Sequence, residues 1–226
     1  MLNTLQQHLE QIYELDTQLP VSDFLITDPA LAHHYDHSAD ARVTDEKLLV
    51  CQNDAGVDVA LYLNDKVVKH LEQNNPLESL HDGNIHQFWI ALEGISHFIY
   101  LAWNAQFDRQ ISLFELELQA EVDKFVATIL LIGQQQNSYL SRNILMHLFL
   151  QSRFDARLSR AELWRYVKAN HFACHYCEGI SNLFSEYRNT ARLFNELRRF
   201  YRLTHHYKLR HIYSVSQRFR PLSFAR

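Results

Sequence analysis

Residues 86–104 of this 226-residue chain read HQFWIALEGISHFIYLAWN, and this stretch decides the fold. Apart from Glu93 and His97, it is almost wholly apolar and aromatic from Phe88 to Trp103. A helix that is apolar nearly all round is buried inside a protein. With Asn84 as its N-cap, the stretch predicts a long buried helix that runs from Ile85 to about Phe107.

The polar residues of this helix form its candidate site. Glu93 and His97 are four residues apart and share a helix face, and His86 lies on that face two turns before Glu93. Burying a carboxylate and an imidazole is costly unless they are paired, bound to a metal or perturbed in pKa. The pair therefore predicts a metal or ligand site, a structural hydrogen-bonded pair, or a proton-transfer site. Gly94 is unfavourable inside a helix, so it predicts the close approach of another helix or a ligand.

The next helix adds carboxylates to this candidate site. Ser112 and Glu115 have the spacing of a capping box, which predicts a helix up to about Gln135. Glu117 and Glu121 share one face of it with Lys124, and antiparallel packing would bring this face opposite the Glu/His pair. The alternative is a solvated face with local Glu–Lys pairs, because the apolar residues of this helix form a separate stripe.

The remaining segments predict further helices and one hairpin. Two β-rich runs, residues 48–51 and 57–63, flank a turn of Asn, Asp and Gly, which is typical of a β-hairpin. A capping box of Ser159 and Glu162 predicts a helix that continues past Phe184. We also expect helices over residues 2–19, 65–73, 140–157 and 189–201, and an irregular acidic segment over residues 20–46.

Composition agrees with a helical fold. The chain has 5 glycines and 4 prolines, where average usage would give about 16 and about 11, which disfavours turn-rich architectures. We predict a mainly α fold, a helical bundle of four to five helices with a small N-terminal β-hairpin. The chain is predicted to be a single domain over residues 1–226. Within it, residues 1–75 hold the first helix, the acidic loop and the hairpin, and residues 84–226 hold the bundle with a basic C-terminal helix.

A second set of candidate metal ligands occurs at residues 171–178, HFACHYCE. His171 and His175 have the i,i+4 spacing that suits zinc on a helix, and Cys174 and Cys177 have CxxC spacing. The alternative is a solvated polar stripe beside two buried thiols. The candidate metal ligands are therefore Glu93, His97, His171 and His175, and the implied cofactor is a divalent transition metal.

The C-terminal quarter is strongly basic. Residues 1–113 contain 5 Lys/Arg and 17 Asp/Glu, whereas residues 114–226 contain 17 and 9. Basic residues between aromatic ones can bind phosphates and stack bases, so we predict a surface for an acidic protein partner or nucleic acid. The alternative is that this segment docks on the acidic half of its own chain. The candidate surface residues are Arg198, Arg199, Arg202, His205, Lys208 and Arg210.

These features support three function hypotheses. The first is a helical binding or accessory protein with a structural Glu/His centre and a basic, aromatic C-terminal surface. The second is a metal- or ligand-dependent enzyme with its Glu/His site between helices. The spacing of Arg199 and His205 is similar to that of the Arg–His pair in HEPN-type helical ribonucleases, and this resemblance implies ribonuclease activity as the third.

Other classes find no support in the sequence. The chain lacks the GxSxG, GxxxxGK[ST], GxGxxG and HExxH motifs of common hydrolases, nucleotide-binding enzymes and zinc proteases. It also lacks a basic, apolar N-terminal signal and an apolar stretch of the roughly 20 residues that cross a bilayer. Its three cysteines are too few for a disulfide framework. We therefore expect a cytoplasmic protein with no membrane association.

Overall fold

The computed structural model describes residues 1–36, 44–53, 56–135, 144–151, 154–185 and 190–218. Helices dominate it, so the predicted mainly α class is confirmed, although the helices exceed the four or five expected. The α-helices are α1 (Leu2–Tyr13), α2 (Pro29–Tyr35), α3 (Asp65–Gln73), α4 (Ile85–Ala105), α5 (Leu113–Gln134), α7 (Arg160–Ser185), α8 (Thr190–Arg202) and α9 (His205–Arg218). A short 3-10 helix, η1 (Val21–Phe24), and a π-helical turn, η2 (Met146–Leu150), complete the helical elements.

The long helices begin where the sequence predicts. The side chain of Ser112 accepts from the backbone N–H of Glu115, whose carboxylate accepts from the N–H of Ser112, so the capping box of α5 is confirmed. The same reciprocal bonds join Ser159 and Glu162 ahead of α7. Each box satisfies two backbone donors that a helix start leaves unpaired.

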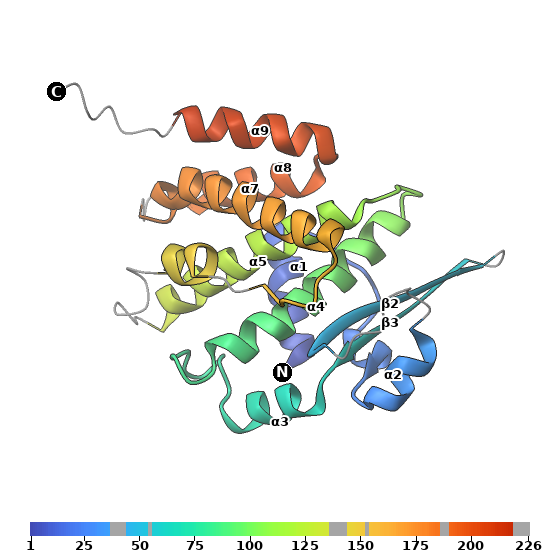
Figure 1. Cartoon of the computed structure of the whole chain (residues 1–226). Coiled ribbons are helices and arrows are strands. Elements are labelled where there is room, and N and C mark those ends of the chain that lie inside the picture. The colour runs from blue at the N-terminus through green and yellow to red at the C-terminus, as the bar shows by residue number, and fades with distance from the viewer. Residues whose placement is uncertain (37–43, 54–55, 136–143, 152–153, 186–189, 219–226) are drawn as a thin grey trace.

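The helices form stacked layers in which α4 and α5 are central. In Figure 1, α9 lies above α7 and α8, α5 and α4 lie below them, and α3 is at the opposite end. Helix α5 packs against α4 on one side and α7 on the other, and α1 packs against α4 and α8. A side chain on α4 or α5 is therefore covered by neighbours from several parts of the sequence.

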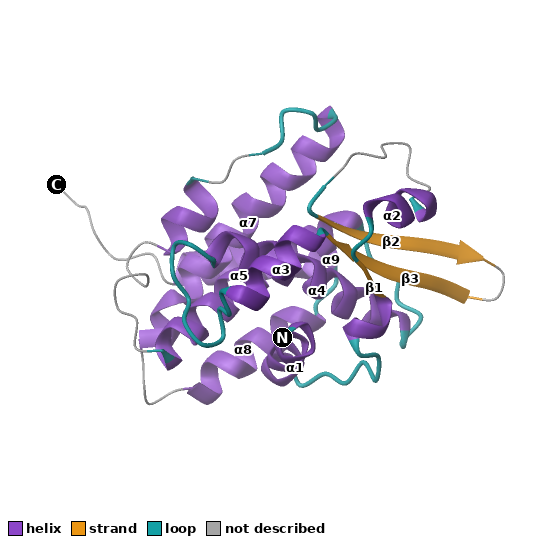
Figure 2. Cartoon of the chain, turned by 90° about the horizontal axis from the view of Figure 1, so that it is seen from below, coloured by secondary structure: helices purple, strands orange, loops and turns teal. Residues whose placement is uncertain are grey.

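The hairpin is confirmed and packs on α4. Strands β2 (Glu46–Asn53) and β3 (Gly56–Leu63) are antiparallel, and Leu48 pairs with Leu61. The short strand β1 (Leu25–Ile26) adds to β3 in parallel, which gives the order β1-β3-β2. Figure 2 shows the hairpin projecting from the helical body. Its base contacts α4, which brings the first residue of β2 to the middle of that helix.

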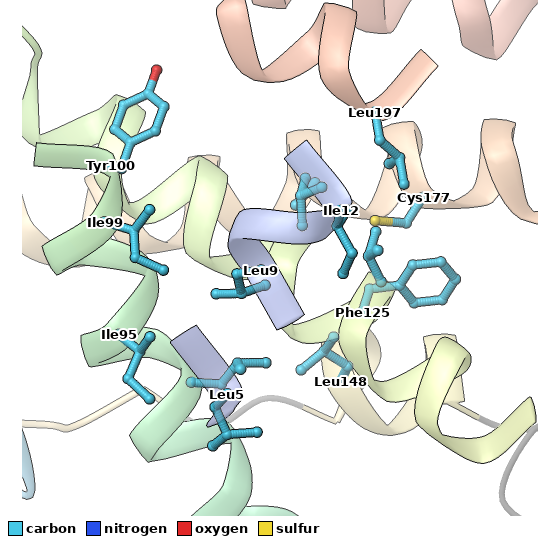
Figure 3. Close-up of a cluster of buried hydrophobic side chains, with 14 of the residues drawn as sticks. Leu5, Leu9, Ile12, Ile95, Ile99, Tyr100, Phe125, Leu148, Cys177 and Leu197 are labelled. Carbon is cyan, nitrogen blue, oxygen red and sulfur yellow. The ribbon is translucent and has the colours of Figure 1, made fainter. Parts of the chain in front are cut away.

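The core is continuous from α1 to α9. Leu5, Leu9 and Ile12 of α1 lie between α4 and the layer formed by α5, α7 and α8, as Figure 3 shows. Burial of each such side chain contributes about 1.5–3 kcal/mol. A smaller cluster of Ala32, Leu49 and Tyr62 lies under α2.

Some segments differ from the sequence prediction. The first helix ends at Tyr13 because Glu14 adopts a left-handed conformation with φ 51° and closes the last turn. The segment from residue 20, expected to be irregular, contains η1, β1 and α2; Asp28 caps α2, and Pro29 begins it. Part of the helix expected over residues 140–157 falls outside the described residues. Its described end is not helical, because Arg157 lies in a turn in which its N–H bonds to the Asp155 side chain.

None of the described helices is both long enough and apolar enough to span a lipid bilayer.

Candidate metal centre

The antiparallel packing of α4 and α5 brings the two predicted sets of polar residues together. His97 lies beside Glu117, Glu93 pairs with Lys124, and the Trp89 indole donates to Thr128. From one contact to the next, the residue number falls in α4 and rises in α5, which is the antiparallel packing considered from the sequence pattern. Glu93, His97, Glu117 and Glu121 therefore belong to one cluster between α4 and α5.

His97 is held by carboxylates from two other elements. Its Nδ1 donates to Oε1 of Glu46 at 3.3 Å, and Glu46 is the first residue of β2. Its Nε2 lies 3.5 Å from Glu117 Oε2, an ion-pair distance, but makes no hydrogen bond. A proton on Nδ1 leaves the lone pair on Nε2, which is the atom that faces the other carboxylates. The hydrogen bond to Glu46 thus fixes the ring orientation, and in the neutral ring it favours the tautomer that a metal ligand requires.

Lys124 links the other two carboxylates. Its Nζ donates to Glu93 Oε2 at 2.9 Å and to Glu121 Oε1 at 2.7 Å. The local Glu–Lys pairing of the expected alternative is present in Glu121 and Lys124, but the face is not solvated, because the Lys124 side chain is only 9% exposed. Glu93 and His97 also do not bond to each other, because Glu93 bonds to Lys124 and His97 bonds to Glu46.

The cluster has excess negative charge. Four carboxylates face two cations, Lys124 and Arg165, whose Nε lies 3.6 Å from Glu117 Oε1. His97 is a third cation when it is protonated, which its raised pKa favours, and the net charge is then −1. The net charge is −2 once His97 is neutral, so a divalent cation that replaces the Nε2 proton would balance it. None of these side chains is more than 26% exposed, so water screens this excess only in part.

The pKa directions follow from this environment. Burial raises the pKa of Glu46 and Glu121, and nearby carboxylates add to the effect. Burial alone would raise the pKa of Glu93 and lower that of His97. For Glu93, Lys124 and His97 outweigh burial and lower its pKa. For His97, Glu117 and Glu46 outweigh burial and raise its pKa well above the ordinary value.

Glu93, His97 and Glu117 have the composition and spacing of a metal site. One ligand atom from each lies within 4.8 Å of the others. Ligands about 2.1 Å from a tetrahedral metal are about 3.4 Å apart, so side-chain rotation has to bring these atoms closer. Among the described residues, six buried side-chain polar atoms lack a hydrogen-bond partner, and three belong to this cluster: His97 Nε2, Glu121 Oε2 and Arg165 Nε. Such orphan atoms are rare in folded proteins and are often explained by a bound ion or water.

Gly94 makes the contact between Glu46 and this cluster possible. A Cβ at Gly94 would lie 2.7 Å from Leu61 Cδ1 and 2.8 Å from Glu46 Cγ, which are steric clashes. The close approach predicted from this glycine is confirmed, but the approaching element is the hairpin rather than a helix or a ligand. A larger residue at this position would force the Leu61 and Glu46 side chains to shift, so glycine favours the contact that brings Glu46 to His97.

A buried network next to the cluster fixes the register of α4 and α5. The Asp123 carboxylate accepts hydrogen bonds from Ser96, Tyr13 and Gln119, at 2.6, 2.5 and 2.8 Å. Ser96 precedes His97 in α4, so this anchor positions the imidazole against α5. Burial raises the pKa of Asp123 to about 6, although these donors oppose the shift.

Three predicted histidines lie outside the cluster. His86 is exposed although it shares a helix face with Glu93, because packed helices cross at an angle and diverge away from the crossing point. His171 and His175 are also exposed, with ring centroids 4.5 Å apart. The buried face of α7 consists instead of Ala169, Ala173, Tyr176, Cys177 and Ile180. His171 and His175, two of the four candidate metal ligands, therefore lie apart from Glu93 and His97.

Lys208, predicted to lie on a partner surface, is fully buried. Its Nζ donates to Gln119 Oε1 and lies 4.3 Å from the ring centroid of Phe200 and 5.0 Å from that of Tyr100. Burial lowers the pKa of Lys208 to about 7, against smaller opposing effects of Asp123 and other neighbours. The prediction is wrong for this residue because α9 turns it toward α5, where it is enclosed by aromatic rings.

Two of the predicted surface arginines bind the end of α1. Arg198 pairs with Glu14 at 2.7 Å and donates to the carbonyl of Ile12, and Arg202 donates to the carbonyl of Glu14. Cations at the C-terminal carbonyls of a helix are favourable. For these two residues, the alternative that the basic segment docks on its own acidic half is confirmed. Arg199 and Arg210 are exposed.

The Arg–His pair of the ribonuclease hypothesis forms no contact among the described residues. His205 stacks on Phe114 with a centroid distance of 4.8 Å and lies 3.3 Å from Ser112 Oγ. Arg199 is exposed on α8, and no described ion pair, hydrogen bond or ring contact joins it to His205. The geometry therefore favours the α4–α5 cluster as the candidate site.

Sequence reasoning missed Glu46, Arg165 and Tyr166. Glu46 begins a strand, and the two others lie near the start of α7, so no helix periodicity links them to Glu93. The sequence feature that pointed to a close neighbour of this part of α4 was Gly94. Comparison of the chain with protein-family models, curated proteins and solved structures finds no match.

Proposed function

We propose that the protein is a metal-dependent enzyme whose centre holds one divalent transition-metal ion between α4 and α5. His97 Nε2 and one carboxylate oxygen each of Glu93 and Glu117 are its ligands. The observation that carries the proposal is the buried His97 Nε2, which has no hydrogen-bond partner among the described residues and lies 3.5 Å from Glu117, while Glu46 holds the opposite ring nitrogen. Carboxylate–histidine–metal arrangements of this kind are common in metalloproteins.

The ligand set favours a catalytic site over a structural one. Structural zinc sites are closed by four protein ligands, whereas catalytic sites use three and keep a position for water or substrate. One imidazole and two carboxylates suit Zn²⁺, Mn²⁺ or Fe²⁺. A metal at this position can polarise a bound oxygen or lower the pKa of bound water. Glu46 and Lys124 would then orient the ligands from outside the coordination sphere.

Partner binding through the C-terminal surface receives less support. Of the six residues predicted for it, Lys208 is buried, and Arg198 and Arg202 are bonded to α1. Arg199 and Arg210 are the exposed arginines that remain for an acidic partner or nucleic acid. This function stays a prediction, as does a cytoplasmic location.

A metal that binds only the folded chain will raise its stability. At a free Zn²⁺ or Mn²⁺ concentration 100 times the Kd, the free energy of unfolding rises by about 2.7 kcal/mol. For a chain of this length we expect the melting temperature to rise by about 5–10 °C. Thermal unfolding of chelator-treated protein, followed by circular dichroism with and without added metal, measures this shift.

The control variant is His171→Ala, which removes an exposed histidine of the other candidate metal pair. We expect it to keep the full shift in melting temperature. Elemental analysis of untagged protein purified without chelator should also give about one metal ion per chain. The proposal is wrong if neither metal shifts the transition, or if His171→Ala abolishes the shift.

A further inference from the structure

Arg165 is the cation in the cluster that is less well paired with carboxylates. Lys124 donates to both Glu93 and Glu121 at hydrogen-bond distances. Arg165 Nε, in contrast, is buried without a hydrogen bond, and its nearest carboxylate oxygen, Glu117 Oε1, is 3.6 Å away. A buried donor left unpaired costs about 1–3 kcal/mol, and more when it is charged. Nε of the guanidinium therefore has hydrogen-bonding capacity that no described residue uses.

The position of Arg165 relates it to the proposed metal. One oxygen of Glu117 faces Arg165, and the other lies 3.5 Å from His97 Nε2. The guanidinium and the proposed metal thus lie on either side of a single carboxylate. When Glu117 coordinates a metal, part of its negative charge is directed to that ion, so the guanidinium is paired even less well.

Apart from the distant ion pair with Glu117, the described surroundings of Arg165 are an aromatic ring and partial solvent. Its guanidinium carbon lies 5.3 Å from the ring centroid of Tyr166, and the arginine side chain is 20% exposed. Nε itself is buried, but part of the side chain is accessible from solvent. Arginine presents a planar fork of donors that matches carboxylate and phosphate oxygens, and such charge-assisted bonds are strong.

We propose, on the basis of the metal-dependent function above, that Arg165 binds the carboxylate or phosphate group of an anionic substrate at the open side of the metal ion. The metal and the guanidinium then hold the same oxyanion from two directions. Substrates of this class are small anionic molecules, and a neutral analogue would lack the group that Arg165 recognises. Arg165 thereby determines specificity, whereas Glu93, His97 and Glu117 hold the metal.

The test uses cobalt as a spectroscopic metal. The full chain is loaded with Co²⁺, and its visible absorption is recorded while inorganic phosphate, acetate or neutral acetamide is added. We expect phosphate or acetate to change the spectrum with saturation and acetamide to leave it unchanged. Arg165→Gln should weaken oxyanion binding by about 10-fold or more, the value of a charge-assisted hydrogen bond, while Co²⁺ affinity stays within about 3-fold.

Two further variants make the result specific. Arg160→Gln removes an exposed arginine at the start of the same helix and should bind the oxyanion as the wild type does. Arg165→Lys keeps the charge but not the fork, so we expect a weaker loss, and this variant decides the question if Arg165→Gln does not fold. If wild type and the Arg165 variants bind the oxyanion with equal affinity, the role of Arg165 is overturned, but the proposed metal site is not. Failure of the wild type to bind Co²⁺ overturns both proposals.

Discussion

His97→Ala is expected to weaken the binding of Zn²⁺ by more than about 100-fold. His97 Nε2 is the buried nitrogen of the proposed centre, and removal of a direct ligand costs more than the 10–100-fold typical of residues outside the coordination sphere. Glu46→Gln should fall within that 10–100-fold range, because an amide oxygen can still accept from His97 Nδ1 but carries no charge. Competition titration against a chromogenic zinc chelator measures both affinities.

The matched control is Glu72→Gln, which removes an exposed carboxylate on α3. It should bind Zn²⁺ as the wild type does, and far-UV circular dichroism should show that all three variants are folded. If His97→Ala retains wild-type affinity, zinc binds elsewhere. The order of the losses also matters, because a larger effect of Glu46→Gln would make Glu46, and not His97, the ligand.

The second large effect is a rise in stability with pH that depends on Lys208. Burial lowers the pKa of Lys208 from 10.5 to about 7, so between these values the unfolded chain binds one more proton than the folded chain. The free energy of unfolding then increases with pH at about 1.36 kcal/mol per pH unit. From pH 7 to pH 9.5, this group adds roughly 3 kcal/mol of stability. Urea unfolding at several pH values measures the change.

Lys208→Met isolates this contribution, since methionine is similar in length and cannot ionise. Asp123, Glu115 and Arg109 also act on the Lys208 ammonium, and other groups titrate in the protein, so the informative quantity is the difference in slope between wild type and variant. We expect the variant to lose about 3 kcal/mol of the rise between pH 7 and pH 9.5. Lys66→Met, at an exposed position on α3, should keep it. Parallel profiles for wild type and Lys208→Met would show that Lys208 is not buried with a lowered pKa.

Much of the fold follows from local patterns in the sequence. The capping boxes at Ser112 and Ser159 set the starts of α5 and α7, and the β-rich runs around residues 53–56 predict the hairpin. These signals are local, because a cap or a tight turn depends on residues three or four apart. The early end of α1 could not be predicted, since it depends on the left-handed backbone of Glu14, a residue type that does not mark such a conformation.

The candidate site could be predicted in part for the same reason. Helical spacing places Glu93 with His97 and Glu117 with Glu121, and antiparallel packing then brings the pairs together. Spacing within one helix cannot show which of its faces meets another helix. It therefore could not indicate that, on α7, Arg165 faces the cluster whereas His171 and His175 face solvent. Lysine is a residue type usually found at the surface, and the burial of Lys208 depends on where α9 packs in the fold.

The most direct test of the account is the location of a bound metal in crystals of the full chain. Crystals grown with Zn²⁺ and measured on both sides of the zinc absorption edge give an anomalous difference map. We expect one strong peak between α4 and α5, about 2.0–2.2 Å from His97 Nε2 and from oxygens of Glu93 and Glu117. A map with no peak there, or with zinc bound only at the exposed His171 and His175, would contradict it.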